Sequence, residues 1–175
     1  MKRCVVFLAL LLSLTGVAQA ADDALSLTAN QAFLAANAKK KGVIVRPSGL
    51  QFRIIRNGFG KRPGPTDTVS IYYTGRIING TLFDGTSPGL PASLPVQDVI
   101  PGWKEALQIM REGDHWELVI PSNLGYGTRG SPDGGIPPNQ TLVFDLQLMT
   151  TTPKPKRGEP GYRPDPHDKD GDEQQ

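Results

Sequence analysis

The sequence predicts an α+β domain built from several antiparallel strands and one short helix. Four runs of alternating apolar residues lie between residues 47 and 150, and clusters of glycine and proline separate them. One segment, residues 101–110, instead repeats its apolar residues at helical spacing. Because a sheet must bury one face, and this helix is the only element available to cover it, we expect a helix packed on a sheet.

Each of the four expected strands alternates between two faces of the sheet. The apolar positions are Leu50, Phe52 and Ile54; Val69, Ile71 and Tyr73; Trp116, Leu118 and Ile120; and Leu142, Phe144, Leu146 and Leu148. The helix has its own apolar stripe, formed by Trp103, Ala106, Leu107 and Met110. Pro101 fits the first turn of that helix, where its missing donor costs nothing, and Gly113 follows its end.

The segments on either side of this domain differ from it in composition. Residues 21–46 predict a short helical segment, with Ser26 or Thr28 as N-cap and Gly42 as terminator, which either packs on the domain or frays. Residues 151–175 hold five of the 16 prolines and almost no apolar side chain, which predicts a disordered tail. Three alternating aspartates at 168, 170 and 172 resemble a calcium loop but lack its terminal glutamate, so a solvated tail is preferred.

Residues 1–20 have the pattern of a cleaved secretory signal. Lys2 and Arg3 precede an apolar run from Cys4 to Leu14, and Ala18-Gln19-Ala20 supplies a small-x-small cleavage site. A signal anchor is the alternative, but the run is short for a membrane span. We expect cleavage after Ala20 and a periplasmic or secreted protein, with no membrane span in the remainder.

Cleavage would change the composition in a way that excludes several kinds of protein. It removes the single cysteine and two of the 19 basic residues, which leaves as many basic as acidic residues, 17 of each. A chain without cysteine has no disulfide framework, cysteine-based zinc site or thiol nucleophile. A chain without net positive charge gives little reason to expect a nucleic-acid partner.

Motifs for covalent or metal-assisted catalysis are also absent. The chain has two histidines, His115 in an expected strand and His167 in the tail, and no G-x-S-x-G, phosphate-loop, dinucleotide or HExxH motif. Asp84 and Glu105 could be imagined as a carboxylate pair, but nothing in the sequence fixes their separation. We therefore expect no metal and no cofactor.

Five segments in order carry a resemblance to a known family: YYTG, GTLFDGT, VIPGW, PSNLGYG and GGIPPNQTLVFDLQL. Together they closely resemble the FKBP-type peptidyl-prolyl cis-trans isomerases over about residues 47–150. NQAFLAANAKKKGV and SGLQF are similar to the exported macrophage-infectivity-potentiator-like branch. The resemblance implies a half-open antiparallel sheet wrapped around one short helix, with a substrate pocket between the two.

The resemblance also implies roles for individual residues. Trp103 would form the floor of the pocket, and its apolar walls would be Tyr73, Phe83, Val99, Ile100 and Phe144. Asp84 and Tyr126 would be its polar groups, acting in catalysis with Tyr73, and Ile136 would lie on an overhanging flap. The backbone N–H of Ile100 and the hydroxyl of Tyr126 would hold carbonyl groups of the bound peptide.

Several of these residues have a structural alternative. Tyr73 and Phe144 could be ordinary core aromatics, Asp84 could close an Asx-turn, and Trp116 is expected to pack rather than to line the pocket. The chain also departs from the family pattern at two places. Residues 91–94 lack an aromatic residue that many members of the family carry. The flap at residues 131–135 is one residue longer than in the commonest eukaryotic form and lacks the histidine of that form.

The resulting hypothesis is a prolyl isomerase that assists the folding of exported proteins. Its partners would be proline-containing polypeptides, with macrolide inhibitors of the family as further ligands. A peptide-binding chaperone or interaction module with weak isomerase activity is the alternative. Because only about 26 residues separate the cleavage site from the domain, we expect a monomer and not a dimer held by a long N-terminal helical region.

Overall fold

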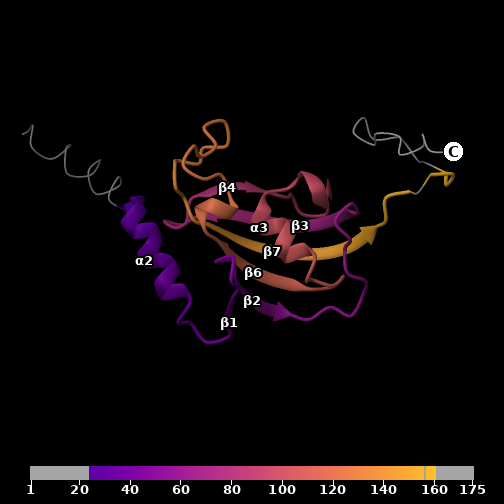
Figure 1. The fold of residues 1–175 in the computed structure, drawn as a ribbon, viewed down its shortest axis with the longest axis horizontal. Coiled ribbons are helices and arrows are strands. Elements are labelled where there is room, and N and C mark those ends of the chain that lie inside the picture. The colour runs from indigo at the N-terminus through magenta and orange to yellow at the C-terminus, as the bar shows by residue number, and fades with distance from the viewer. Residues whose placement is uncertain (1–23, 156, 161–175) are drawn as a thin grey trace, which may run out of the picture.

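A seven-stranded antiparallel sheet forms the body of the molecule (Figure 1). The computed structural model describes residues 24–155 and 157–160, so the expectations for the signal segment and for residues 161–175 lie outside it. The strands run in the order β1-β2-β6-β7-β3-β4, and β5 pairs with β3 beside this path. Their bounds are β1 Val43–Val45, β2 Gln51–Arg56, β3 Thr68–Ile77, β4 Leu82–Gly85, β5 Ala92–Pro95, β6 His115–Ile120 and β7 Leu142–Thr152.

The four expected strands correspond to β2, β3, β6 and β7, and the α+β class with an antiparallel sheet is confirmed. Three further strands, β1, β4 and β5, were not predicted. Each is three or four residues long and includes exposed positions, so it leaves too little alternation to see in the sequence. Ile54 was expected in the core, but it is 37% exposed; it lies opposite Trp116 near the end of β2, just before the register of β2 against β6 shifts.

Helix α3, Pro101–Leu107, packs against the sheet (Figure 1). Trp103, Ala106 and Leu107 of the expected stripe are buried, and so is Met110, although it lies beyond the end of the helix. The contact with β6 is close: a Cβ atom added at Gly102 would lie 2.6 Å from Cγ2 of Ile120. A glycine at this position therefore lets the first turn of the helix approach the sheet. Short 3-10 helices at Val96–Asp98 and Ser122–Leu124 lie in the connections that precede α3 and follow β6.

Helix α2, Leu27–Asn37, is held to the domain by amide side chains and not by an apolar stripe. Asn30 and Asn37 are its buried residues. Asn30 Nδ2 donates to Gln140 Oε1 at 3.3 Å, and Asn37 Nδ2 donates to Gln51 Oε1 at 2.9 Å. Of the two alternatives for this segment, packing is therefore the one observed, through contacts that a search for apolar periodicity cannot find.

Helix α2 begins at the expected N-cap but does not end at the expected glycine. Ser26 is the N-cap, and its Oγ accepts a hydrogen bond from Ala29 N at 3.2 Å. The helix ends at Asn37 with Ala38 as C-cap, so the prediction that Gly42 terminates it is wrong. Gly42 instead has a φ of +81° in the turn that leads into β1, a conformation that favours glycine.

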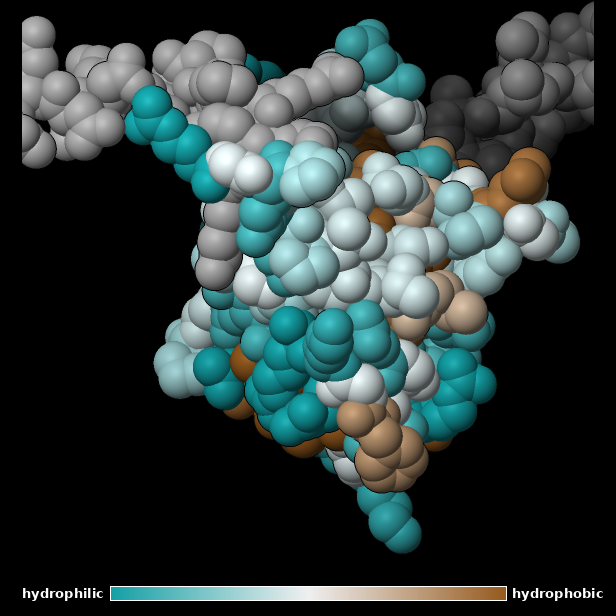
Figure 2. Space-filling view, turned by 90° about the vertical axis from the view of Figure 1, so that its right-hand side faces the viewer, coloured by the Kyte–Doolittle hydropathy of each residue, from teal (hydrophilic) through white to brown (hydrophobic). Residues whose placement is uncertain are grey.

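The surface at one end of the molecule is mostly polar. Figure 2 shows this face covered mainly by hydrophilic residues, with apolar residues scattered between them. Within the residues that the structure describes, no helix is both long enough and apolar enough to cross a membrane.

Candidate active site

Four aromatic rings from four different elements meet between helix α3 and the sheet. Tyr73 comes from β3, Phe83 from β4, Trp103 from α3 and Phe144 from β7. The ring centroids of Tyr73 and Trp103 are 4.9 Å apart at 86°, and those of Trp103 and Phe144 are 5.0 Å apart at 72°. Phe83 meets Phe144 edge-on at 5.6 Å. These edge-to-face contacts are the preferred geometry of aromatic pairs, so the rings form one packed cluster, here called the aromatic site.

Gly75 makes room for two of these rings. In the ladder between β3 and β7 it lies opposite Phe144, and it lies opposite Asp84 in the ladder between β3 and β4. A Cβ atom at Gly75 would be 2.7 Å from Cε1 of Phe144 and 2.7 Å from Cζ of Phe83. Any other residue would push the rings apart. The position of this glycine within YYTG indicated no role for it, because a glycine in a strand does not reveal which side chains approach it.

The residues of the aromatic site range from buried to exposed. Trp103 and Phe144 are 4% and 3% exposed, Tyr73 and Phe83 are half-buried, and Asp84 is exposed. Asp84 Oδ2 accepts a hydrogen bond from the Tyr73 hydroxyl at 2.7 Å, and its Oδ1 accepts one from Gly85 N at 2.8 Å. The carboxylate is therefore held at the rim of the ring cluster by a side chain and a backbone donor.

Both tyrosines near this carboxylate are kept in their neutral form. Burial raises the pKa of Tyr73 well above its usual 10, and the hydrogen bond and negative charge of Asp84 raise it further. The pKa of Tyr126 is also raised, mainly by burial and to a smaller extent by the negative charge of Asp84. The two phenols are therefore hydrogen-bond donors throughout the physiological pH range.

Two donors beside the aromatic site have no partner among the residues that the structure describes. The carbonyl of Ile100 accepts from Trp103 N at 3.0 Å and from Lys104 N at 3.1 Å, whereas its own N–H donates to no group. The hydroxyl of Tyr126, a residue 39% exposed, also makes no hydrogen bond. Both groups are free to donate to the carbonyl oxygens of a bound peptide.

The remaining predicted residues differ in exposure. Val99 and Ile100 are half-buried and pack against the core, as walls of a pocket would. Ile136 is only 4% exposed, and its backbone exchanges two hydrogen bonds with Ser131, at 2.8 and 2.9 Å, which closes the loop expected to be a flap. The segment that lacks the family's aromatic forms β5, where Ala92 and Leu94 pack against the core.

In the described part of the chain, no three histidine, cysteine, aspartate or glutamate side chains are grouped in a way that could hold a metal ion. The three aspartates that resemble a calcium loop lie among residues 161–175, outside the structure's description.

Comparison with known proteins identifies the class to which this fold and site correspond. Residues 60–149 match the family model of the FKBP-type peptidyl-prolyl cis-trans isomerase, and residues 14–54 match the domain amino terminal to it. The chain is 52% identical over 120 residues to the outer membrane protein MIP of Legionella longbeachae, covering 68% of this chain and 51% of that protein. It is 52% identical over 118 residues to the FKBP-type 22 kDa peptidyl-prolyl cis-trans isomerase of Escherichia coli K12, covering 67% and 57%.

Solved structures of peptidyl-prolyl cis-trans isomerases also resemble this chain in fold. The crystal structure of FkpA from Escherichia coli matches with a TM-score of 0.69 and 39% identity, covering 81% of this chain and 67% of that chain. A peptidyl-prolyl cis-trans isomerase from Pseudomonas syringae matches with a TM-score of 0.68 and 35% identity, covering 73% and 93%. This chain belongs to the family of FKBP-type peptidyl-prolyl cis-trans isomerases. It spans about half the length of the curated relatives that it matches.

Proposed function

We propose that this protein accelerates rotation about X–Pro peptide bonds and that the aromatic site binds the proline. The observation that carries the proposal is the cluster of Tyr73, Trp103 and Phe144 bordered by Asp84 and by two free donors, Ile100 N–H and the Tyr126 hydroxyl. Membership of the isomerase family supports it.

The chemistry of this reaction needs no nucleophile, metal or cofactor. Rotation about an X–Pro amide is opposed by a barrier of about 20 kcal/mol, because twisting the bond destroys its resonance. The twisted amide is less dipolar than the planar one and loses less hydration when it leaves water. An aromatic surface that excludes water therefore favours the twisted state over the planar one, which is differential binding of the transition state. An acceleration of ~10⁵-fold corresponds to about 7 kcal/mol.

The polar groups of the site position the peptide around the rotating bond. Ile100 N–H and the Tyr126 hydroxyl would hold two carbonyls of the chain on either side of the proline, so that only the X–Pro bond turns. Asp84 keeps the Tyr73 ring in place through the 2.7 Å hydrogen bond and sets a negative charge beside the pocket, where it can act on the changing amide dipole.

We further propose that the substrates are exported polypeptides during folding, and that the protein acts as a periplasmic or secreted monomer. The secretory pattern of residues 1–20 and the absence of cysteine from the rest of the chain support export. Similarity to a protein named as an outer membrane protein supports the same compartment.

A protease-coupled assay on an X–Pro peptide tests the function. We expect the wild-type chain to be active, with kcat/KM reduced by at least about tenfold in Asp84→Ala and to a smaller extent in Tyr126→Phe. The matched controls are Asp133→Ala and Tyr72→Phe, which remove the same groups from exposed or half-buried positions elsewhere.

A second readout separates catalysis from simple peptide binding. Suppression of aggregation of an unfolded protein is measured with the same variants. Chaperone activity that survives Asp84→Ala and Tyr126→Phe, with no isomerase activity in the wild type, would show a peptide-binding module and refute the proposed function.

A further inference from the structure

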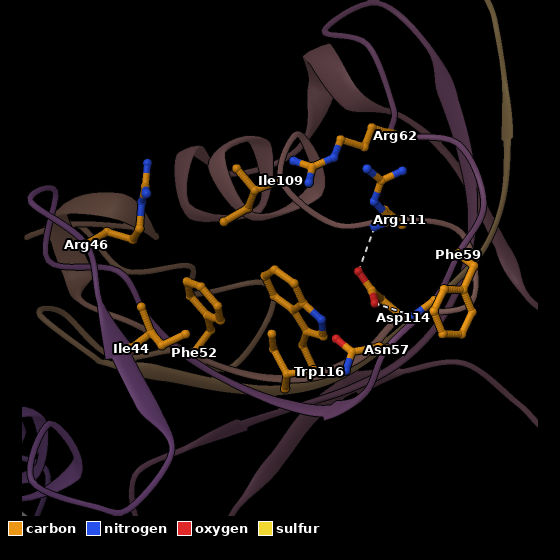
Figure 3. Close-up of a pocket in the computed structure, with 12 residues that line it drawn as sticks. Ile44, Arg46, Phe52, Asn57, Phe59, Arg62, Ile109, Arg111, Asp114 and Trp116 are labelled. Carbon is orange, nitrogen blue, oxygen red and sulfur yellow. Dashed lines mark hydrogen bonds between the residues drawn. The ribbon is translucent and has the colours of Figure 1, made fainter.

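A second cavity with an aromatic floor lies away from the aromatic site. It has a volume of about 650 Å³ and is lined by β1, β2 and β6 together with residues 57–62 and 109–114 (Figure 3). Trp103 lies in the first turn of helix α3, whereas Ile109 and Arg111 follow the end of that helix, so the two sites lie at its opposite ends. None of the residues assigned to the isomerase site lines this cavity.

The floor of the cavity is apolar. The rings of Phe52 and Trp116 stack with centroids 4.4 Å apart and an interplanar angle of 9°. Ile44 and Ile54 extend this surface and are 45% and 37% exposed. Phe59, at the edge, is 93% exposed. The stacked rings belong to the buried core, and the exposed Ile44, Ile54 and Phe59 beside them form an apolar patch of the kind that marks a binding surface.

The rim of the cavity is positively charged. Three arginines line it, and we call it the arginine cavity after Arg46, Arg62 and Arg111. Arg46 pairs with Glu105 at 3.1 Å, a pair whose two side chains are partly exposed. The guanidinium of Arg111 donates only to the carbonyl of Gly60, at 3.2 Å, and Arg62 has no partner among residues 24–155 and 157–160.

The carboxylates nearby keep their negative charge but form no ion pair with Arg62 or Arg111 within the described residues, so three arginines line the cavity against one carboxylate, Asp114. Asp114 lines the cavity, but its oxygens accept from the backbone N–H groups of Gly58 and Arg111, each at 2.6 Å. Glu112 is occupied in the same way by the N–H groups of Thr151 and Lys61. In Figure 3 the guanidinium groups of Arg62 and Arg111 lie across the cavity from the Phe52 and Trp116 rings. Two cations facing an apolar floor favour a ligand that is both anionic and apolar.

The floor also contains a donor without an acceptor. The indole Nε1 of Trp116 is buried and makes no hydrogen bond within the described residues. A buried N–H without an acceptor costs free energy, and an oxygen brought by a ligand removes that cost. In Figure 3 this nitrogen points toward Asn57, an exposed residue whose side chain a ligand can displace.

We propose that the arginine cavity is a second polypeptide-binding site, which takes an acidic segment that also carries leucine or phenylalanine side chains. The apolar side chains would cover Ile44, Ile54 and Phe59 above the buried stack of Phe52 and Trp116, and the carboxylates would pair with Arg62 and Arg111. Such a site would hold a substrate chain independently of its prolines. The proposal goes beyond isomerase activity, because the site needs none of the residues that act on the X–Pro bond.

Fluorescence anisotropy of two labelled peptides tests the proposal on the full chain. One peptide alternates glutamate with leucine and phenylalanine and contains no proline; its twin replaces each glutamate by lysine. We expect the acidic peptide to bind and its affinity to fall with salt, whereas the lysine twin does not bind. Equal binding of both peptides, or of neither, would overturn the proposal.

Two variants, in which arginines of the cavity are replaced by glutamate, test where the acidic peptide binds. Arg62→Glu combined with Arg111→Glu should weaken binding of the acidic peptide by about tenfold or more while isomerase activity stays unchanged. The matched control, Lys39→Glu with Lys41→Glu, changes net charge equally on an exposed surface beyond α2 and should bind normally. Since Arg62 is exposed and its side chain makes no hydrogen bond or ion pair within the described residues, Arg62→Glu alone should give an intermediate loss in a folded chain.

Three results would contradict this assignment. Unchanged affinity in the double variant would place the peptide elsewhere. Loss of binding in Asp84→Ala would place it at the aromatic site. Binding that occurs only after removal of residues 161–175, which carry Asp165, Asp168, Asp170, Asp172 and Glu173, would show that the chain's own acidic segment is the occupant.

Discussion

The aromatic site and the arginine cavity have similar floors and opposite rims. Each is built around a tryptophan 4% exposed, Trp103 in one and Trp116 in the other, and neither buried indole N–H has a partner in the part of the chain that the structure describes. The rim of the first consists of Asp84 and two neutral tyrosines, and that of the second of arginines. In the two functions that we propose, an apolar floor supplies affinity and the polar rim decides which ligand is accepted.

The largest expected effects come from removing either indole. Trp103→Ala and Trp116→Ala should each lower the free energy of unfolding by about 3–5 kcal/mol, because each leaves a cavity beside stacked or edge-packed rings. Urea denaturation checks this. Isomerase activity per folded molecule, measured at low temperature, should disappear only in Trp103→Ala, and its loss in both variants would show that the two sites are not independent.

Substitution of Asp114 should lower stability, whereas substitution of Asp84 should lower activity. Asp114 is 4% exposed and holds two backbone N–H groups, so Asp114→Ala leaves both donors unpaired and should cost roughly 1–3 kcal/mol of stability. Asp84 is exposed, and Asp84→Ala should change stability by only about 0.5 kcal/mol while lowering activity. The reverse pattern in thermal unfolding and isomerase assays would contradict the roles given to the two residues.

Gly75→Ala tests how closely the rings of the aromatic site must approach. The new methyl group would overlap Phe83 and Phe144, so we expect a loss of about 1–3 kcal/mol in stability together with lower activity. Gly64→Ala is the control, since Gly64 lies in a loop outside both sites and its nearest neighbour is the Asp67 side chain at 3.3 Å. Denaturation curves of the two variants should differ, and equal curves would refute the steric argument.

The smallest effect concerns alkaline pH and should arise at the aromatic site. Tyr73 and Tyr126 have raised pKa values in the folded chain, so above pH 10 the folded state binds more protons than the unfolded state. The stability contributed by the neutral phenols is complete below pH 10 and is lost as pH rises from there. Unfolding measured between pH 8 and 11 should show a steeper decline in the wild type than in Tyr73→Phe. Ultraviolet difference titration should show an earlier phenol ionisation in Asp84→Asn.

Periodicity in the sequence predicted what depends on local pattern. The alternation in β3, β6 and β7 and the stripe of α3 needed only the geometry of strands and helices, and the structure confirms them. The resemblance to the isomerase family supplied the candidate site residues, and the structure brings Tyr73, Phe83, Trp103 and Phe144 together. Their roles in catalysis stay predictions.

Contacts between distant segments could not be predicted from the sequence. Ile54 was expected in the core because it keeps the period of β2, but it is exposed and lines the arginine cavity. Helix α2 docks through Asn30 and Asn37. Their partners, Gln140 and Gln51 respectively, lie in other segments of the chain. Hydrogen bonds of this kind have no periodicity, since a single amide needs only one partner in the right place.

The sequence by itself determined the spacing of the core residues and, through its motifs, the family. The tertiary structure alone decided what surrounds each floor. Trp116 was expected only to pack, and it does stack on Phe52, but sheet pairing and the chain after α3 also bring Arg62 and Arg111 to its cavity. The physical reason is that the charge at a site depends on which segments meet in space, and the sequence order of those segments does not specify it.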